Sequence, residues 1–467
     1  MNTVFRKIVL LTILVHFQQH SVFSQKKTTP ASKIKLNENI ISGPMISWIE
    51  HESVCIWLEV NSKVKKVEID FWEKYNSTDF KTIEFKGELG KEFNPLQLII
   101  TGLTPGKTYD CEVLLDNIKQ ELKPKLIFTT KKNWEWREDA PDFSFLLGSC
   151  TYINDSLYDR PGKPYGQSTS IFDAMFNVNT DFMLWTGDNT YLREADYSSE
   201  YGIERRYSHT RKHKDLQRLL ISRPNYATWD DHDFGPNDGN YTYDLKNKSA
   251  ETFKNYWPAK SYKSEGVYSK FTWSDTEFFL LDDRYFRSAN DYPDSLNSKP
   301  NPAKNFLGNT QLEWLKNSLI SSKSTFKFIV CGSQVQNKLA SKELFCKYSY
   351  EYNDLMSFIT NNKIDGVLFI SGDRHFTELL KFKPNADFYE LYEYTCSPLT
   401  SSVHDISKSK ELNNPNRIEG SLIQENNFGK IEITGEKNNR ELSIITYSAS
   451  GTPLFEYKIN EKQLKAK

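Results

Sequence analysis

The sequence predicts an α/β domain preceded by a small all-β domain, and two patterns lead to this prediction. From about residue 40 to 130, short alternating stretches are separated by turn residues, and no helical period is sustained. From about residue 143, short apolar runs alternate with helical segments, which is typical of a largely parallel or mixed sheet. At 467 residues the chain is long enough for two or three domains.

The N-terminal segment has the pattern of a signal peptide. Arg6 and Lys7 precede an apolar run over residues 8–15, followed by small and polar residues. The run is too short to span a bilayer as a lasting anchor, and an uncleaved anchor is the alternative. We expect a signal peptide at 1–24, a linker at 25–37, and a secreted, periplasmic or cell-surface protein. The mature chain has no other segment that is long and apolar enough to cross a membrane.

Residues 38–132 are predicted to form the small β-sandwich. Its Leu-Thr-Pro-Gly-Lys-Thr-Tyr segment resembles the corner of fibronectin type III domains, with Tyr109 as a candidate tyrosine corner. Cys111 stands where an immunoglobulin-like disulfide would lie, and Cys55 is on the candidate partner strand. The alternation around Cys55 points its side chain away from the sandwich core, so the sequence leaves this disulfide open.

Residues 133–467 are predicted to form the α/β domain, which closes with an antiparallel ribbon over 429–434 and 441–447. One helix is expected to begin with a capping box at Thr310, and another from about Glu351. The other expected strands are short apolar runs, each followed closely by a polar group. They lie at 143–147, 181–185, 225–229, 277–281, 326–330 and 366–370.

Charge and composition exclude some functions and leave others open. The formal net charge of −1 offers no net attraction to nucleic acid or acidic lipid, and we find no nucleic-acid-binding motif. Aromatic residues make up 14% of the chain, which suits either deep cores or a carbohydrate-facing surface. Basic residues gather over 204–223; this segment is either an amphipathic helix with Leu216, Leu219 and Leu220 inward or an attractive rim for anionic substrates.

Polar side chains concentrate where one predicted strand ends. The strand at 225–229 is followed by four carboxylates, an imidazole and an amide before Gly239. Other strands end in the same way, at Cys150, Asp188, Asp282 and Asp373. Because the carboxyl ends of strands in open α/β sheets line one crevice, these residues are expected to converge. Each alone has a structural alternative, such as a helix cap or an inert thiol, but together they form a set of metal ligands.

The order of these motifs resembles that of PhoD-like alkaline phosphatases, which belong to the calcineurin-like metallophosphoesterases. The resemblance covers roughly residues 140–405, and the preceding sandwich is similar to that family's N-terminal domain. It implies a metallophosphoesterase-type mixed β-sheet sandwich flanked by helices. The matching motifs are Gly148-Ser149-Cys150, Gly187-Asp188-Asn189-Thr190-Tyr191, Trp229-Asp230-Asp231-His232-Asp233 with Asn237, Leu281-Asp282-Asp283-Arg284 and Ser371-Gly372-Asp373-Arg374-His375.

The resemblance implies a dinuclear metal centre. Cys150 and Tyr191 would bind the first metal, His375 would complete its site, and Asp188 would bridge to the second metal. A phenol with a pKa of about 10 loses its proton at neutral pH only beside a strongly polarising cation. We therefore expect Fe³⁺ at the first site.

Hard oxygen ligands would form the second site. The resemblance assigns Asp231, Asn237 and Asp373 to it, although which ion Asp373 and His375 each serve is left open. Such ligands suit Ca²⁺ or Mg²⁺, and Zn²⁺ is possible there.

Three further residues would act on the substrate. His232 would protonate the leaving oxygen, and Asp233, which stands where the family usually has Glu, would orient His232. Arg284 would pair with phosphate oxygens, or else form a structural salt bridge. In the implied reaction a metal-bound hydroxide attacks phosphorus in line, without a phosphoenzyme.

We therefore expect an exported alkaline phosphatase-like hydrolase of phosphomonoesters. One alternative keeps the metal site but cleaves phosphodiesters, as a phospholipase D-like enzyme or on a cell-wall polymer. The other alternative is a non-catalytic surface protein that binds glycans. The sequence carries no signal for an oligomeric state.

Overall fold

The computed structural model describes residues 39–340 and 343–466. The expected signal peptide at 1–24 and linker at 25–37 lie outside the described residues. Among the described residues, no helix is both long and apolar enough to cross a membrane.

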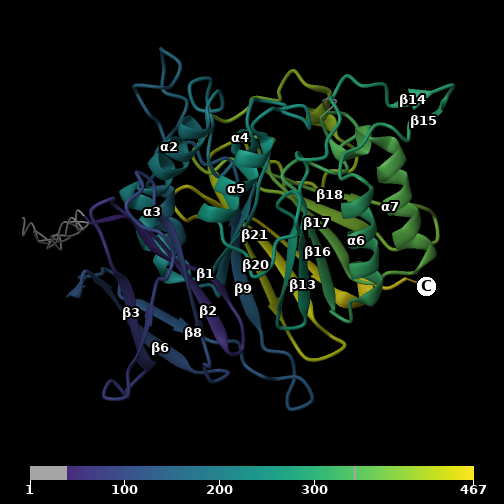
Figure 1. Cartoon of the computed structure of the whole chain (residues 1–467). Coiled ribbons are helices and arrows are strands. Elements are labelled where there is room, and N and C mark those ends of the chain that lie inside the picture. Colours follow the sequence, from purple (N-terminus) through teal and green to yellow (C-terminus); the bar gives the residue numbers. More distant parts are fainter. Residues whose placement is uncertain (1–38, 341–342, 467) are drawn as a thin grey trace, which may run out of the picture. The chain divides into compact units, whose positions relative to one another are not determined.

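The first part of the described chain is an antiparallel β-sandwich, coloured purple to blue in Figure 1. One sheet has the order β1-β2-β5, and the other has the order β4-β3-β6-β7 with β8 paired to β6. Along β6, buried residues alternate with half-buried ones, as expected when one face of a strand packs against a second sheet. The strands are β1 Ile40–Ile49, β2 Ser53–Val60, β3 Val67–Glu73, β4 Lys81–Glu84, β5 Pro95–Thr101, β6 Thr108–Leu115, β7 Ile118–Lys119 and β8 Leu126–Thr129.

The predicted tyrosine corner is present in this sandwich. The hydroxyl of Tyr109 accepts a hydrogen bond from the backbone N–H of Thr104 at 2.8 Å. Cys111 packs in the sandwich core, whereas Cys55 belongs to the hydrophobic cluster that continues into the α/β part. Both cysteines are free thiols because their side chains lie on different sides of β2.

Two six-stranded sheets form the centre of the α/β part in the described chain. The first has the order β11-β10-β9-β20-β21-β22, and the second has the order β12-β13-β16-β17-β19-β18. β9, β10 and β11 are parallel to one another, as are β13, β16, β17 and β19; the other neighbours are antiparallel. The strands are β9 Phe143–Gly148, β10 Phe182–Thr186, β11 Asn225–Thr228, β12 Ser269–Trp273, β13 Thr276–Leu280, β16 Phe326–Val330, β17 Val367–Ser371, β18 Glu378–Phe382, β19 Leu391–Thr395, β20 Asn427–Thr434, β21 Glu441–Ser448 and β22 Pro453–Asn460; a separate hairpin pairs β14 Ser295–Leu296 with β15 Lys299–Pro300.

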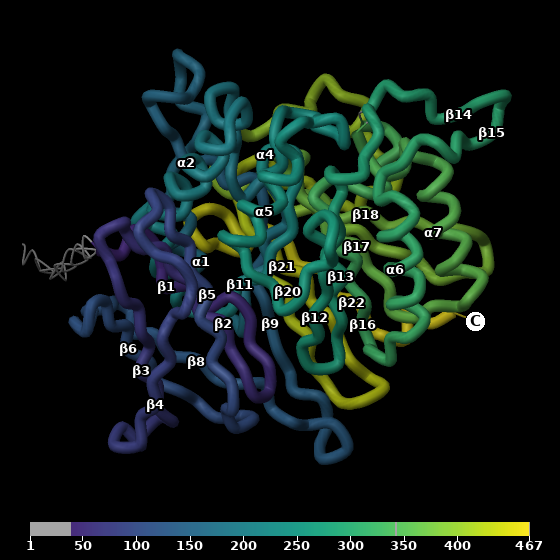
Figure 2. Tube along the Cα trace, in the orientation of Figure 1, coloured from purple at the N-terminus to yellow at the C-terminus, as the bar shows by residue number. Residues whose placement is uncertain are grey.

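The two sheets pack face to face, with helices outside them. Phe145 of β9 packs edge to face on Phe278 and Phe328 of the second sheet, at ring distances of 5.2 and 5.8 Å. The neighbouring Leu146 points the other way, into a second cluster that includes residues of the helices on that side. In Figure 1 and Figure 2, α6 and α7 lie on one side of the sheets and α2 lies on the other, where Figure 1 also labels α3. The helices are α1 Ile171–Asn177, α2 Glu200–Arg211, α3 Lys214–Ser222, α4 Asp231–Phe234, α5 Lys246–Tyr256, α6 Asn309–Ser321 and α7 Ser349–Asn361, with 3₁₀ turns η1 Phe345–Lys347, η2 Lys410–Asn413 and η3 Glu461–Leu464.

This architecture confirms the predicted fold class, a helix-flanked mixed double sheet after a small β-sandwich. The predicted closing ribbon is also confirmed, because β20 pairs with β9 and β21 follows it. The predicted capping box at Thr310 is wrong. The N-cap of helix α6 is Gly308, two residues earlier. The carboxylate of Glu351 accepts hydrogen bonds from the backbone N–H groups just before the helix.

The basic segment over 204–223 joins the sandwich to the α/β part, and both belong to one compact unit. The three leucines predicted to face inward, Leu216, Leu219 and Leu220, are buried. Arg211 is buried too, and its guanidinium lies over the rings of Trp57 and Trp257 at 4.7 and 3.7 Å.

Arginines earlier in this segment are also engaged inside the protein. Arg205 donates to Asp155 at 2.7 Å, and Arg206 donates to Asp159 at 2.8 Å and to Asp196 at 2.7 Å. These carboxylates compensate the charges of Arg205 and Arg206, so the two arginines stabilise the fold. The alternative prediction, an open cationic rim for anionic substrates, is not supported.

Candidate metal centre and active site

Four of the predicted site residues follow the carboxyl ends of strands in the two packed sheets. Cys150 follows β9, Asp188 follows β10, Asp231 opens α4 directly after β11, and Asp373 follows β17. β9, β10 and β11 are adjacent and parallel, and the sheet that contains β17 packs against theirs. The strand ends therefore deliver these side chains to one region, as the sequence analysis predicts.

Glycines allow the connecting loops to approach one another closely. A Cβ atom on Gly372 would lie 2.5 Å from Ser149 Oγ and 2.5 Å from the carbonyl oxygen of Thr186. Gly187 has a φ of +95°, and a Cβ on it would lie 2.9 Å from the Cβ of Asp230. Any larger residue at these positions would push the loops apart, so both glycines are needed for the site's geometry.

The backbone is strained at four of the predicted ligands. Cys150, Asp188, Asp373 and His375 have φ angles of 62°, 52°, 66° and 56°, in the left-handed region that favours glycine. Such conformations cost free energy and cluster at functional sites, where the surrounding structure imposes them. Here they direct polar side chains of separate loops toward a common centre.

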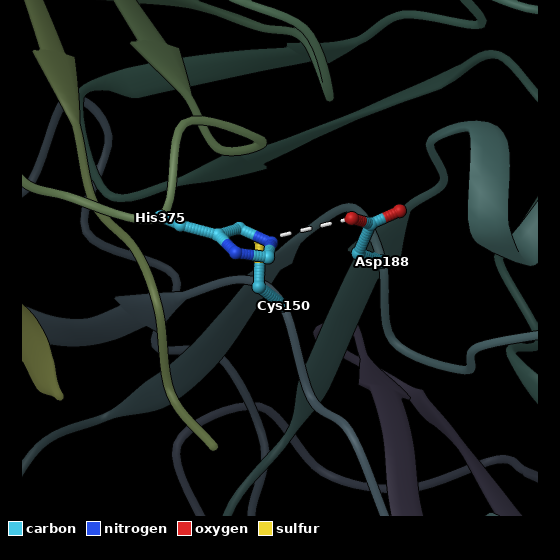
Figure 3. Close-up of side chains that lie close together, drawn as sticks. All are labelled: Cys150, Asp188 and His375. Atoms are coloured by element: carbon cyan, nitrogen blue, oxygen red, sulfur yellow. Dashed lines mark hydrogen bonds between the residues drawn. The ribbon is translucent and has the colours of Figure 1, made fainter. Parts of the chain in front are cut away.

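The first group of donor atoms comes from Cys150, Asp188 and His375, whose ligand atoms lie within 4.8 Å of one another (Figure 3). All three residues are buried, and Cys150 Sγ lies 3.7 Å from Asp188 Oδ2. The hydroxyl of Tyr191 lies 3.0 Å from His375 Nε2. The structure thus brings together the four residues predicted for the first metal.

Two further donor groups continue from the first. Asp188, Asp231 and His232 form one group, and Asp231, Asp238 and Glu343 form the next. Asp188 is shared by the first two groups and Asp231 by the last two. The described donors therefore form a continuous series, from sulfur and nitrogen at one end to carboxylate oxygen at the other.

The electrostatics of these residues fit bound cations. Burial and the neighbouring carboxylates Asp231, Asp233 and Asp373 raise the pKa of Asp188 well above its ordinary value. Burial and Glu343 do the same to the pKa of Asp373, whose Oδ2 atom is buried and has no hydrogen-bond partner among the residues that the structure describes. Carboxylates packed this closely need a positive counter-charge to stay ionised.

His232, a member of the second donor group, is held in place by its backbone and by its ring. Its backbone N–H donates to Asp188 Oδ1 at 3.2 Å, and its ring stacks on Tyr191 at 4.2 Å. Nδ1 of His232 is buried and has no hydrogen-bond partner among residues 39–340 and 343–466. Burial lowers the pKa of His232, an effect that the nearby Asp231 opposes.

Asp233 occupies a different position from the one that the resemblance implies. Its carboxylate accepts hydrogen bonds from the backbone N–H groups of Asn189 and Thr190 at 3.0 and 2.9 Å, and from the side chain of Asn189 at 3.2 Å. Asp233 therefore holds the loop between Asp188 and Tyr191 in place. It is linked to His232 as the next residue in the chain.

Arg284 is enclosed by acidic groups. It is fully buried, donates through Nε to Asp230 at 2.6 Å, and donates to Glu343 at 2.6 Å and to Ser333 at 2.9 Å. These contacts match the structural salt bridge that the sequence analysis weighed against phosphate binding.

The carboxylate end of the series contains residues other than those predicted. Asn237, predicted as a ligand, is exposed in the turn after α4. Its neighbour Asp238, interpreted from sequence as a turn residue, joins Asp231 and Glu343, and its N–H donates to Asp231 Oδ2 at 2.7 Å. Glu343 lies in a long connection after β16 with no motif around it, so no sequence signal pointed to it.

A helix-flanked mixed double sheet defines a metallophosphoesterase-like core when it carries a series of Cys, His, Asp and Glu donors that is buried at its sulfur end. The solved structure of PhoD shares this fold, with a TM-score of 0.70 and 14% sequence identity over 90% of this chain and 91% of that chain.

The family follows from the sequence match. The model of the PhoD-like phosphatase family matches residues 145–444, and the chain belongs to this family. A curated relative, alkaline phosphatase D of Bacillus subtilis (strain 168), is 23% identical over 349 residues. That match covers 65% of this chain and 58% of the relative, so the chain spans less than two thirds of the relative's length. The resemblance inferred from the motifs is thereby confirmed.

Proposed function

We propose that this protein is a metal-dependent phosphoester hydrolase that acts on phosphomonoesters. The observation that carries the proposal is the series of three donor groups linked through Asp188 and Asp231, in a chain of the PhoD-like phosphatase family. Side-by-side cations are what two-metal phosphoryl chemistry needs.

The donor chemistry changes along the series, and this suggests two kinds of ion. Thiolate, imidazole and phenolate from Cys150, His375 and Tyr191 would hold Fe³⁺ together with Asp188. The carboxylates beyond Asp188 would hold Ca²⁺, with Mg²⁺ or Zn²⁺ as alternatives. When bound, these cations would neutralise charge on the phosphate oxygens and activate a water molecule as the nucleophile.

Four oxygen-bearing residues are our candidates for that second kind of ion. Asp231 belongs to two of the donor groups, and Asp238 and Glu343 share one of them with it. Asp373 follows β17, and its buried Oδ2 atom has no hydrogen-bond partner among the described residues, with Arg374 at 3.7 Å as its ion-pair partner.

His232 is our candidate for the proton donor to the leaving oxygen. Its ring is fixed by stacking on Tyr191, and its Nδ1 atom has no hydrogen-bond partner in the described part of the chain. We propose supporting roles for the two other residues assigned to catalysis. Asp233 positions the loop that carries Tyr191, and Arg284 offsets the charge of Asp230 and Glu343.

The His232→Ala variant is expected to discriminate between leaving groups. General acid catalysis contributes about 10²–10⁴-fold to the rate, and a poor leaving group needs the proton more than a good one. We expect kcat to fall by about that factor for phenyl phosphate and by much less for p-nitrophenyl phosphate. Equal losses on both substrates would exclude His232 as the proton donor.

Two measurements on purified protein test the proposed function. Metal analysis is expected to find tightly bound iron and a second metal, and hydrolysis of p-nitrophenyl phosphate is expected to exceed that of bis(p-nitrophenyl) phosphate. The reverse preference would establish the diesterase alternative. Protein that binds neither metal and hydrolyses neither ester would contradict the proposal and favour a glycan-binding module.

We also propose that the protein is exported. Support comes from the charged, apolar and small-residue segments over residues 1–24. N-terminal sequencing of the mature protein tests this, and a mature chain that still begins at Met1 would contradict cleavage.

A further inference from the structure

Tyr165 lies at the surface of the site, with its hydroxyl directed inward. Its side chain is 36% exposed, and its hydroxyl oxygen lies 3.3 Å from Nδ1 of His375. Its ring packs against Tyr152 at 4.9 Å and against His375 at 6.0 Å. None of the predicted metal or substrate contacts involves this residue.

The two ring nitrogens of His375 face different surroundings. Nε2 lies 3.0 Å from the hydroxyl of Tyr191 and 3.3 Å from Ser401 Oγ, and the ring belongs to the donor group with Cys150 and Asp188. Nδ1 faces Tyr165. A neutral imidazole carries one N–H, and a metal can bind only the nitrogen without it.

Backbone contacts fix Tyr165 in place. Ser402 Oγ donates to the carbonyl of Tyr165 at 2.8 Å, and the N–H of Gln167 donates to the carbonyl of Thr400 at 2.6 Å. The loop that carries Tyr165 is therefore tied to the loop after β19. That second loop also covers His375, because the ring of His404 packs on it at 4.3 Å.

We propose that Tyr165 is a positioning residue, whose hydroxyl oxygen accepts the Nδ1 proton of His375 and so leaves Nε2 free to bind a metal beside Cys150 and Asp188. This inference rests on the proposed metal centre. Metal-binding histidines donate their second N–H to an oxygen acceptor, and loss of that acceptor typically weakens metal affinity 10- to 100-fold. Tyr165 supplies this oxygen from a half-exposed side chain, so it can be changed with little effect on the core.

The Tyr165→Phe variant tests the proposal, because it removes the hydroxyl and keeps the ring. Metal loss from purified enzyme is followed by elemental analysis during dialysis against EDTA, and the Nδ1 and Nε2 shifts of ¹⁵N-labelled histidine report the tautomer in the metal-free protein. We expect about 10-fold or greater weakening of metal retention and a mixture of tautomers at His375. The melting temperature of the metal-free protein is expected to be unchanged.

A matched control and the opposing results make the test decisive. Tyr292→Phe removes a hydroxyl from another half-exposed tyrosine, on the loop before β14, and is expected to behave as wild type. The proposal would be overturned if Tyr165→Phe retained metal as well as wild type, or if a raised KM were the only effect of the substitution. Either result would leave the proposed function intact. A wild-type protein that binds no metal would overturn both.

Discussion

Replacing Asp188 with asparagine is expected to lower kcat for p-nitrophenyl phosphate by about 10³-fold or more. Asp188 belongs to two of the three donor groups, so its loss removes a ligand common to both. Metal ions contribute several kcal/mol of transition-state stabilisation, and about 1.4 kcal/mol corresponds to a tenfold change in rate. Steady-state kinetics and metal analysis of the purified variant check this expectation.

The same variant is expected to leave the metal-free protein at least as stable as wild type. Asp188 is buried among Asp231, Asp233 and Asp373, and these neighbours together with burial raise its pKa. A neutral amide of similar size relieves that repulsion, so the melting temperature in EDTA should stay equal or rise. The surface variant Asp173→Asn, on α1, is the control for removal of a carboxylate. Wild-type kcat and metal content in Asp188→Asn would show that the donor series is not the catalytic centre.

Replacing Arg284 with methionine is expected to destabilise the protein by about 3–5 kcal/mol. Arg284 is fully buried and pairs with Asp230, which is fully buried too, and with Glu343. Methionine fills much of the same volume but leaves both carboxylates without their counter-charge. Denaturant unfolding of the metal-free protein measures the loss.

Two further variants distinguish this structural role from a contact with the substrate. Arg218→Met breaks a partly exposed pair with Asp173 and should cost less than about 1 kcal/mol. The double variant Asp230→Asn/Arg284→Met removes both partners of the buried pair and should recover part of the lost stability. If Arg284 bound the phosphate instead, the single variant would raise KM and leave the unfolding free energy unchanged.

Much of the fold was predictable because its local patterns agree with its packing. Strand β16 has the predicted bounds, β9 extends one residue beyond its predicted end, and β10 is shifted by one residue at both ends. Apolar runs of this length are buried on both faces, as expected for strands between two layers. The cap of α6 was missed because a distant carboxylate, Glu351, satisfies the backbone groups before it.

Part of the site was predictable for a related reason. Cys150, Asp188 and Asp231 follow strands within a few residues, so knowing the strands placed them at one edge of a sheet. Asp238 and Glu343 lie on turns and connections, where position depends on tertiary contacts. The role of Arg284 also depended on tertiary contacts. Its sequence position does not show whether the guanidinium binds a substrate or pairs with a carboxylate.

The stretch from Asp230 to Asp238 has features that the sequence determined and others that depended on the tertiary structure. By itself the sequence determined three things: the family, which motif follows which strand, and the residue types available for metal binding. These depend on local spacing and composition. Only the tertiary structure decided that Asp238 joins Asp231, that Asp233 holds the neighbouring loop, and that Tyr165 reaches His375. The contacts of Asp233 and Tyr165 join residues 44 and 210 positions apart in the chain. The contact of Asp238 is local, but it depends on how the turn after α4 folds back on Asp231.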